Sequence, residues 1–287
     1  YAFALALVFP VGVFFMLQTK NVVAKLVWGA MLLAMVYCVV LTLSRGGLLA
    51  LAAAVLLVLW QFGIKRKRRY LIPLAVLGAL AIVAVSPGQF AARVESIFNP
   101  TLDATGSGWA RRELLSRAID VTLASPLLGV GPGNFPVLSG NWKGAHNTYL
   151  QLSAEGGIPA LLIYFVILGY SFRNLRRIQR QSSDPQIQDL TSALFAALGC
   201  YVIGAFFADT VYHFFPFLIF GYVSALYIYV TSLAQPAEGV EAAGSARESQ
   251  KVPQARSNPF LEGWQRDKGA ARLASLRETH VRNRRNR

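Results

Sequence analysis

Long apolar runs set the strongest limit on how this chain can fold. Seven stretches are almost entirely apolar, at residues 1–17, 26–43, 48–64, 71–86, 158–172, 190–208 and 215–233. A helix needs about 20 mostly apolar residues to cross the hydrocarbon core of a bilayer. The runs are continuous and lack the alternation of apolar and polar residues that is typical of membrane β-strands. We therefore predict an all-α fold, a polytopic bundle of about seven transmembrane helices.

The overall composition agrees with a membrane protein. Hydrophobic residues make up 54% of the chain and charged residues 15%, against roughly 25% charged residues in soluble domains. The 28 Lys and Arg against 14 acidic residues could indicate nucleic-acid binding, but they lie mostly in short loops and one tail, so we expect no nucleic-acid partner. Cys38 and Cys200 lie inside apolar runs, so neither a disulfide framework nor a Cys-based metal site is indicated. Because the chain starts at Tyr1 within an apolar run, we expect it to be the C-terminal part of a longer protein.

Basic residues alternate between successive loops. They are frequent at residues 20–25, 65–69 and 173–180 and in the tail, and sparse in the loops between. Loops rich in Lys and Arg stay on the cytoplasmic side of a membrane. We therefore expect a multi-pass protein of the bacterial inner membrane, with the tail in the cytoplasm and with Arg45, His146 and Asp209 on the periplasmic side.

The runs and loops predict four parts. Residues 1–86 hold four transmembrane helices, 87–145 form a periplasmic loop, 146–233 hold three transmembrane helices, and 234–287 form a disordered, basic cytoplasmic tail. Within the loop we expect short helices at 90–98 and 109–125. The second should place Leu115, Ala118, Ile119 and Thr122 on one face and end before Pro126.

A glycine cluster at residues 129–134 follows that second helix. It loosely resembles a dinucleotide-binding fingerprint, but it follows a helix rather than a strand and contains Pro132. We therefore predict a turn rather than a nucleotide site.

Three arginines are candidates for anion binding on the periplasmic side. Arg45 lies in the sequence Ser-Arg-Gly-Gly at 44–47, which we interpret as a tight turn between apolar runs. Its planar fork suits a phosphate, although an arginine at a helix end can also snorkel to the membrane surface. Arg111 and Arg112 open the expected helix at 109–125. The alternative for this helix is an ordinary solvated face carrying a Glu113–Arg117 pair.

His146 begins a polar stretch at the mouth of an expected membrane helix. If the following residues are helical, Asn147, Gln151 and Glu155 share one stripe, with His146 at its edge. Glu155 then points away from His146 and is not its direct partner. A histidine here is a candidate base, and the alternative is an ordinary surface residue.

Asp209 and His213 border the last periplasmic loop, four residues apart. They are either an auxiliary pair for the same site or simply part of a helix end. The chain has no His, Cys or Asp cluster with metal-ligand spacing, so no metal or other cofactor is expected.

Taken together in this order and spacing, the motifs resemble those of the O-antigen ligase and polymerase superfamily. They are the Ser-Arg-Gly-Gly at 44–47, Arg111 with Leu115, the segment Pro-Leu-Leu-Gly-Val-Gly-Pro-Gly-Asn-Phe at 126–135, and His146-Asn147 with Gly157. The resemblance covers roughly residues 26–233. Members transfer glycans from a polyprenyl-diphosphate carrier at the outer face of the inner membrane.

The resemblance implies roles for particular residues. The family's diphosphate-binding arginines match Arg45 and Arg111, with Arg112 as the alternative register, and its essential histidine matches His146. One departure is Ala160, where the family has a second glycine.

The resemblance also implies an inverting, metal-independent transfer. Two arginines would stabilise the departing diphosphate, and a neutral His146 would take the proton of the acceptor hydroxyl. The expected partners are a polyprenyl-diphosphate-linked glycan, membrane lipids, and a glycan, lipid A core or protein as acceptor. Ligation in lipopolysaccharide synthesis, polysaccharide polymerisation and protein O-glycosylation all remain open. A lipid-linked sugar transporter is the alternative of a different class, but transporters place ionisable groups near the bilayer midplane, where these runs are almost free of charge.

Overall fold

The computed structural model describes residues 1–85, 95, 107–140 and 142–234. Apart from residue 95, the expected helix at 90–98 lies outside these residues, as does the tail from residue 235 onward.

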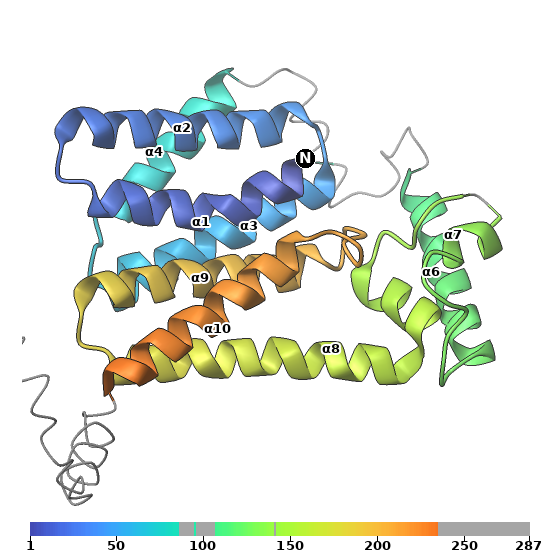
Figure 1. The fold of residues 1–287 in the computed structure, drawn as a ribbon. Helices are drawn as coiled ribbons and strands as arrows, with labels where there is room; N and C mark the ends of the chain where they lie inside the picture. The colour runs from blue at the N-terminus through green and yellow to red at the C-terminus, as the bar shows by residue number, and fades with distance from the viewer. Residues whose placement is uncertain (86–94, 96–106, 141, 235–287) are drawn as a thin grey trace, which may run out of the picture. The chain divides into compact units, whose positions relative to one another are not determined.

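The described residues form helices joined by turns, with no β-strand among them (Figure 1). The helices, in chain order, are α1 (Ala2–Gln18), α2 (Val22–Leu41), α3 (Arg45–Val58), which continues as the π-helix η1 (Leu59–Lys65), α4 (Leu71–Val85), α6 (Ser107–Ala124), α7 (Phe135–Leu138), α8 (Thr148–Gln181), α9 (Pro185–Gly204) and α10 (Phe215–Ala234).

Each of the seven apolar runs lies largely in a helix, although the runs at 26–43 and 190–208 end in turns. Five helices are long and apolar enough to cross a membrane. These are α2, α3 with η1, α8, α9 and α10, whereas α1 and α4 are apolar but shorter. The all-α class and the polytopic membrane character are therefore confirmed, and the structure supports five of the seven expected spans.

Polar residues at the helix starts explain where several helices begin. The side chains of Asn21, Ser44, Asn147 and Asp184 each accept a hydrogen bond from a backbone N–H of the first helical turn. Such caps satisfy donors that the helix itself leaves without partners. The expected turn at 44–47 was misplaced, because the Ser44 cap makes Arg45 the first residue of α3 and moves the turn to residues 42–44.

Helix α8 differs most from its prediction. It extends ten residues before and nine after the expected run at 158–172, with a break at Gly157, where φ is 74° and ψ is 176°. Arg173, Arg176, Arg177 and Arg180 therefore lie on the last turns of a helix rather than in a loop. The apolar run marks only the part of a helix that suits lipid, and backbone hydrogen bonding carries the helix further.

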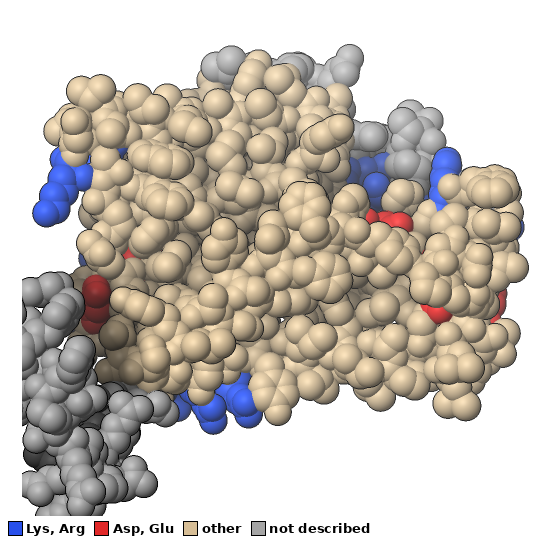
Figure 2. All heavy atoms as spheres, in the orientation of Figure 1, with Lys and Arg blue, Asp and Glu red and all other residues tan. Residues whose placement is uncertain are grey.

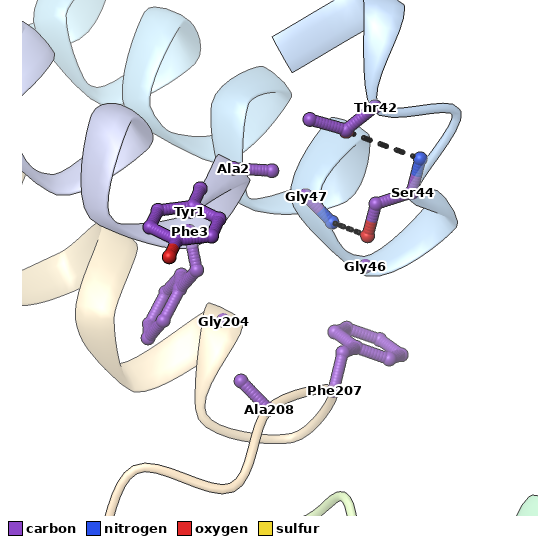
Figure 3. A pocket seen from close by; sticks show the side chains of 10 residues that line it. All are labelled: Tyr1, Ala2, Phe3, Thr42, Ser44, Gly46, Gly47, Gly204, Phe207 and Ala208. Carbon is purple, nitrogen blue, oxygen red and sulfur yellow. Dashed lines mark hydrogen bonds between the residues drawn. The ribbon is translucent and has the colours of Figure 1, made fainter. Parts of the chain in front are cut away.

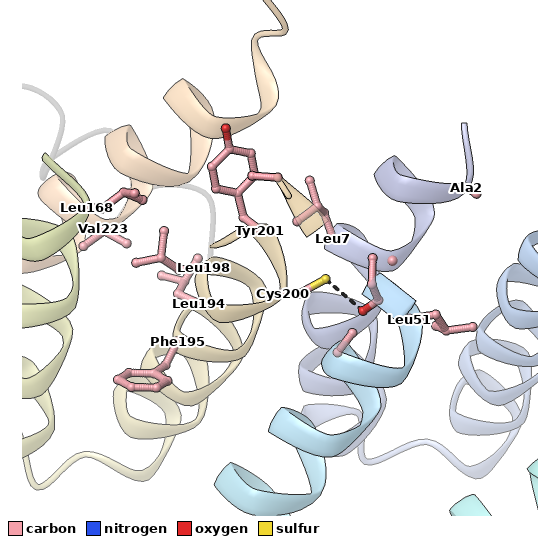
Figure 4. Close-up of a cluster of buried hydrophobic side chains, with 14 of the residues drawn as sticks. Ala2, Leu7, Leu51, Leu168, Leu194, Phe195, Leu198, Cys200, Tyr201 and Val223 are labelled. Atoms are coloured by element: carbon pink, nitrogen blue, oxygen red, sulfur yellow. Dashed lines mark hydrogen bonds between the residues drawn. The ribbon is translucent and has the colours of Figure 1, made fainter. Parts of the chain in front are cut away.

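The core lies where α1, α3 and α9 meet, with α8 and α10 against α9 (Figures 1 and 4). Leu7, Leu51, Leu198 and Tyr201 are buried there, and the Cys200 thiol donates to the Ala50 carbonyl at 3.3 Å. Several contacts involve alanines with no more than 1% exposure, namely Ala6, Ala50, Ala54 and Ala197. Small residues let membrane helices approach closely, and the resulting dispersion contacts replace the hydrophobic effect that lipid does not supply.

Successive turns lie at alternate ends of this bundle. We call the end formed by residues 42–47, 144–148 and 205–213 the histidine end, and the end formed by residues 18–21, 61–69 and 182–189 the aspartate end. The basic loops at 20–25 and 65–69 lie at the aspartate end. On the face drawn in Figure 2, Lys and Arg side chains are confined to the margins, and the middle, over α10 and α8, carries none.

Candidate functional site

The break in α8 is held by the glycine turn, residues 126–134. The Val130 and Gly131 amides donate to the carbonyls of Ala154 and Glu155, both at 2.9 Å, and the Ile158 amide donates to the Pro126 carbonyl at 2.8 Å. Backbone groups that the break takes out of the helix ladder thus find partners in the turn. The predicted turn is confirmed, and the structure shows that its backbone bonds to α8 at the break.

Two glycines make this contact sterically possible. A Cβ on Gly129 would lie 2.4 Å from the backbone carbon of Glu155, and one on Gly157 would lie 2.5 Å from the Leu127 oxygen. Both residues also have positive φ, of 63° and 74°, which side chains strongly disfavour. The turn and α8 therefore fit together only with glycine at both positions.

A buried carboxylate lies beneath this contact. Glu155 is 2% exposed, and its Oε1 accepts hydrogen bonds from the Phe135 amide and the Gln151 side chain, both at 3.3 Å. Its Oε2 accepts from the Tyr212 hydroxyl, whose oxygen accepts from the Gly133 amide at 2.8 Å. Glu155 thus joins α7, α8 and the loop before α10.

Tyr212 is a residue that the sequence reasoning missed. Desolvation of its hydroxyl and the hydrogen bond to Glu155 raise the pKa of Tyr212 to about 12, so the phenol remains a donor at neutral pH. The two residues are 57 positions apart, and no spacing rule connects them.

Gln151 links this network to the residue before His146. It is 1% exposed, and its Oε1 accepts from the Ala145 amide at 3.0 Å, while its side chain also bonds to Asp209. Burial and the nearby charge of Glu155 raise the pKa of Asp209, and His213 and Gln151 partly oppose that rise. The structure therefore brings Gln151, Glu155 and Asp209 together.

His146 is half-buried, and hydrogen bonds fix the residues directly before and after it. Its φ is +50°, an uncommon conformation outside glycine that surrounding contacts must maintain. Asn147 caps α8, so it is not part of the helical stripe, and the Thr148 amide donates to the Ala205 carbonyl at 2.9 Å. Burial, then the charges of Arg111 and Lys143, lower the pKa of His146, which keeps the imidazole neutral at neutral pH.

Arg45 and Arg111 lie at the same end as His146. Arg111 is near enough for its charge to act on the imidazole. Arg45 begins α3 beside a cavity of about 280 Å³, whose lining includes Ser44 and Gly46 on one side and Phe207 on the other (Figure 3). Residue 208 contacts the His146 segment in turn, since the Thr148 hydroxyl donates to the Ala208 carbonyl at 2.8 Å. The start of α3 and the His146 segment thus share the 205–208 turn.

Other candidates are placed less closely. Arg112 is exposed on α6, and Arg117 pairs with Glu113 at 2.7 Å, as the alternative for this helix predicted. The predicted buried face of α6 was wrong at Ile119, which is 46% exposed, and Leu114 is buried in its place together with Ala118. Ala118 packs against Phe135 of α7 and Ala154 of α8, so tertiary contacts rather than the apolar pattern alone decide which face of α6 is buried.

His213 lies in the loop before α10, with its ring 5.7 Å from that of Phe215. In the part of the chain that the structure describes, no three His, Cys, Asp or Glu side chains gather as a metal site would need.

These features define a polytopic helical membrane protein with a histidine and two arginines at one end. The family model described as O-antigen ligase matches residues 29–165, slightly less than half of the chain. The match includes the start of α3, all of α6 and the break in α8. It supports the O-antigen ligase-like superfamily that the motifs indicated, and with it a glycosyltransferase-like membrane enzyme. No curated protein matches the chain.

Proposed function

We propose that this protein transfers a glycan from a polyprenyl-diphosphate carrier to an acceptor hydroxyl, as an O-antigen ligase does. The observation that carries the proposal is the setting of His146. The imidazole is kept neutral by burial and by Arg111, and its backbone is held by Gln151 at one side and by the cap of α8 at the other.

His146 acts as the general base in this proposal. The acceptor oxygen attacks the anomeric carbon while the bond from that carbon to the diphosphate oxygen breaks. The acceptor proton passes to the imidazole, and the departing diphosphate keeps the electron pair. A single displacement of this kind inverts the anomeric centre. Positioned bases contribute about 10²–10⁴ to a rate.

Arg45 and Arg111 bind the diphosphate, with Arg112 as the alternative for the second position. A guanidinium donates two parallel hydrogen bonds to a phosphate. Helices α3 and α8 both begin at the histidine end, and the positive ends of their dipoles favour an anion there. The chain's own cations thus supply the stabilisation that the leaving group needs, so the proposed reaction needs no metal.

Gln151, Glu155 and Asp209 position the base and are not the base themselves. Gln151 bonds to the Ala145 amide, next to His146, and also to both carboxylates. Asn147 contributes through its cap, and His213 through its charge on Asp209.

The decisive experiment compares two variants of the full-length protein in the membrane. His146→Ala should abolish glycan transfer and leave binding of the lipid-linked donor almost unchanged, because the arginines hold the diphosphate. Arg45→Lys should weaken donor binding, because an ammonium lacks the planar fork. Transfer at the parent rate by His146→Ala would refute the base, and loss of donor binding in that variant would make His146 a binding residue.

The acceptor is identified by supplying one donor with lipid A core, a repeat-unit glycan or a protein. Product on lipid A core supports ligation, whereas the other products would indicate a polymerase or a protein oligosaccharyltransferase. Movement of the intact donor across the membrane without a product would indicate a transporter.

The proposed orientation puts the histidine end in the periplasm and the aspartate end in the cytoplasm of the inner membrane. A cysteine introduced at Ser107 should react with a membrane-impermeant reagent from outside, and one at Ser182 should not. The opposite pattern would reverse the orientation.

A further inference from the structure

Two cations from different helices meet at the aspartate end. Lys65 ends η1, and its ammonium lies 5.6 Å from the centroid of the Phe195 ring. Phe195 packs against Phe172 on α8, one helical turn before Arg176, and the charge of Arg176 acts on Lys65. Both side chains are exposed. Like charges brought together in this way favour a bound anion.

Among the described residues, neither carboxylate at this end forms a salt bridge with Lys65 or Arg176. Asp189 is fully buried and already binds Arg66 at 2.9 Å and Arg68 at 2.7 Å. Asp184, the other described acid at this end, caps α9. Lys65 and Arg176 therefore remain a local excess of positive charge.

A row of aromatic rings runs from this pair along the bundle. The Trp60 and Phe195 ring centroids are 5.9 Å apart, and those of Phe195 and Phe172 are 5.2 Å apart. The Lys65 ammonium lies 3.9 Å from the Trp60 centroid, and Arg176 follows Phe172 by about one helical turn. Trp60 is 40% exposed and Phe172 is partly exposed, whereas Phe195 between them is buried, so the two outer rings are accessible from the side of the bundle.

We propose that Lys65 and Arg176 bind the phosphate of one anionic phospholipid whose acyl chain lies along Trp60 and Phe172. Cations next to interfacial aromatic residues match a lipid with a charged headgroup and apolar chains. Topology alone accounts for basic residues in the loops at this end. It does not account for two cations from separate helices that meet over one aromatic row.

The test titrates the purified full chain in detergent with phosphatidylglycerol and with phosphatidylcholine of the same acyl chains, and counts bound lipids by native mass spectrometry. The parent should prefer phosphatidylglycerol, and the double variant Lys65→Gln/Arg176→Gln should lose about tenfold or more in affinity for it. The matched control, Lys67→Gln/Arg180→Gln, removes two exposed cations from the same end, and neither has a described aromatic partner. It should bind phosphatidylglycerol as the parent does.

Two further measurements keep the proposal open to refutation. Trp60→Ala should weaken phosphatidylglycerol binding without changing the charge, and thermal unfolding should show that each variant is folded. Equal binding of the two lipids by the parent would overturn the proposal, as would an equal loss in the control variant. Displacement of the lipid by inorganic phosphate at similar concentration would also overturn it, since the chain contacts would then contribute nothing.

Discussion

Two buried carboxylates, one at each end of the bundle, have opposite surroundings. Asp189 is fully buried and binds two guanidinium groups together with the Gln18 amide. Glu155 is 2% exposed, and its three hydrogen-bond donors, a backbone amide, a side-chain amide and a phenol, are all neutral.

The difference lies in how each carboxylate is stabilised, by charged donors at Asp189 and by neutral donors at Glu155. Asp189 ties α9 to the residues after η1 through two ion pairs and to α1 through the neutral Gln18 amide. The neutral donors leave the charge of Glu155 without a counter-ion, and this charge raises the pKa of Asp209 nearby.

The largest expected effect belongs to the aspartate end. Asp189→Asn should lower the free energy of unfolding by about 3 kcal/mol, because it leaves two guanidinium groups without their counter-ion. The value is at the low end for such pairs, since Arg66 and Arg68 remain 23% and 27% exposed. Transfer per folded molecule should stay near that of the parent. Denaturant or thermal unfolding in detergent measures the first quantity, and a product assay the second.

Asp184→Asn is the matched control, because asparagine caps a helix as well as aspartate does and Asp184 is exposed. If Asp189→Asn and Asp184→Asn had the same free energy of unfolding, the ion pairs of Asp189 would not distinguish the aspartate end from the histidine end.

Next in size is Gly157→Ala at the break of α8. The unfavourable backbone conformation alone should cost about 1–3 kcal/mol, and the added methyl group would collide with the Leu127 oxygen. Protease sensitivity at residues 126–134 should rise and transfer should fall. Gly169→Ala in the same helix meets nothing within 4 Å and should leave both unchanged. A tolerated Gly157→Ala would show that the turn and α8 need not touch.

A smaller effect is expected for Tyr212→Phe. It removes one hydrogen bond to Glu155 and the acceptor for the Gly133 amide, worth about 1 kcal/mol together. Hydrogen exchange should accelerate at residues 133–135, while the aspartate end stays protected. Tyr222→Phe, an exposed tyrosine on α10, should change nothing. Unchanged exchange in Tyr212→Phe would separate Tyr212 from the Glu155 network.

The smallest effect concerns pH. Arg111 and Lys143 lower the pKa of His146, so removing either positive charge makes the imidazolium easier to form and raises that pKa. Because the proposed base must be neutral, the acid limb of the kcat/KM profile should move to higher pH in Lys143→Gln, and further in Arg111→Gln, since Arg111 is the larger cause. A shift to lower pH would contradict the assignment of His146 as base.

Some of this architecture follows directly from the residues. Each apolar run became a helix because a backbone in lipid has few other ways to satisfy its hydrogen bonds. The glycine cluster at 129–134 was predicted as a turn, and Arg45, Arg111 and His146 were placed at one end by the alternation of basic residues between successive loops.

Contacts between segments that are far apart in the sequence could not be predicted from the apolar runs and motifs. Asp189 lies 123 residues from Arg66 and Glu155 lies 57 from Tyr212, and neither pair follows from a periodic pattern. The face of α6 was misjudged at Ile119, because its burial depends on contacts with α7 and α8 that the apolar pattern of one helix does not reveal.

The tie between Glu155 and Tyr212 has a consequence for how the protein is made. A ribosome delivers the glycine turn first, then α8, and Tyr212 only after α9 has emerged. Until that point Gly133 and Glu155 each lack one partner, so the network around His146 is incomplete in every shorter nascent chain. Tyr212 is the last residue to join this network, and α10 begins shortly after it. Assembly of the histidine end is thereby coupled to near-completion of the described helical part, and a chain released early carries the histidine without its full network.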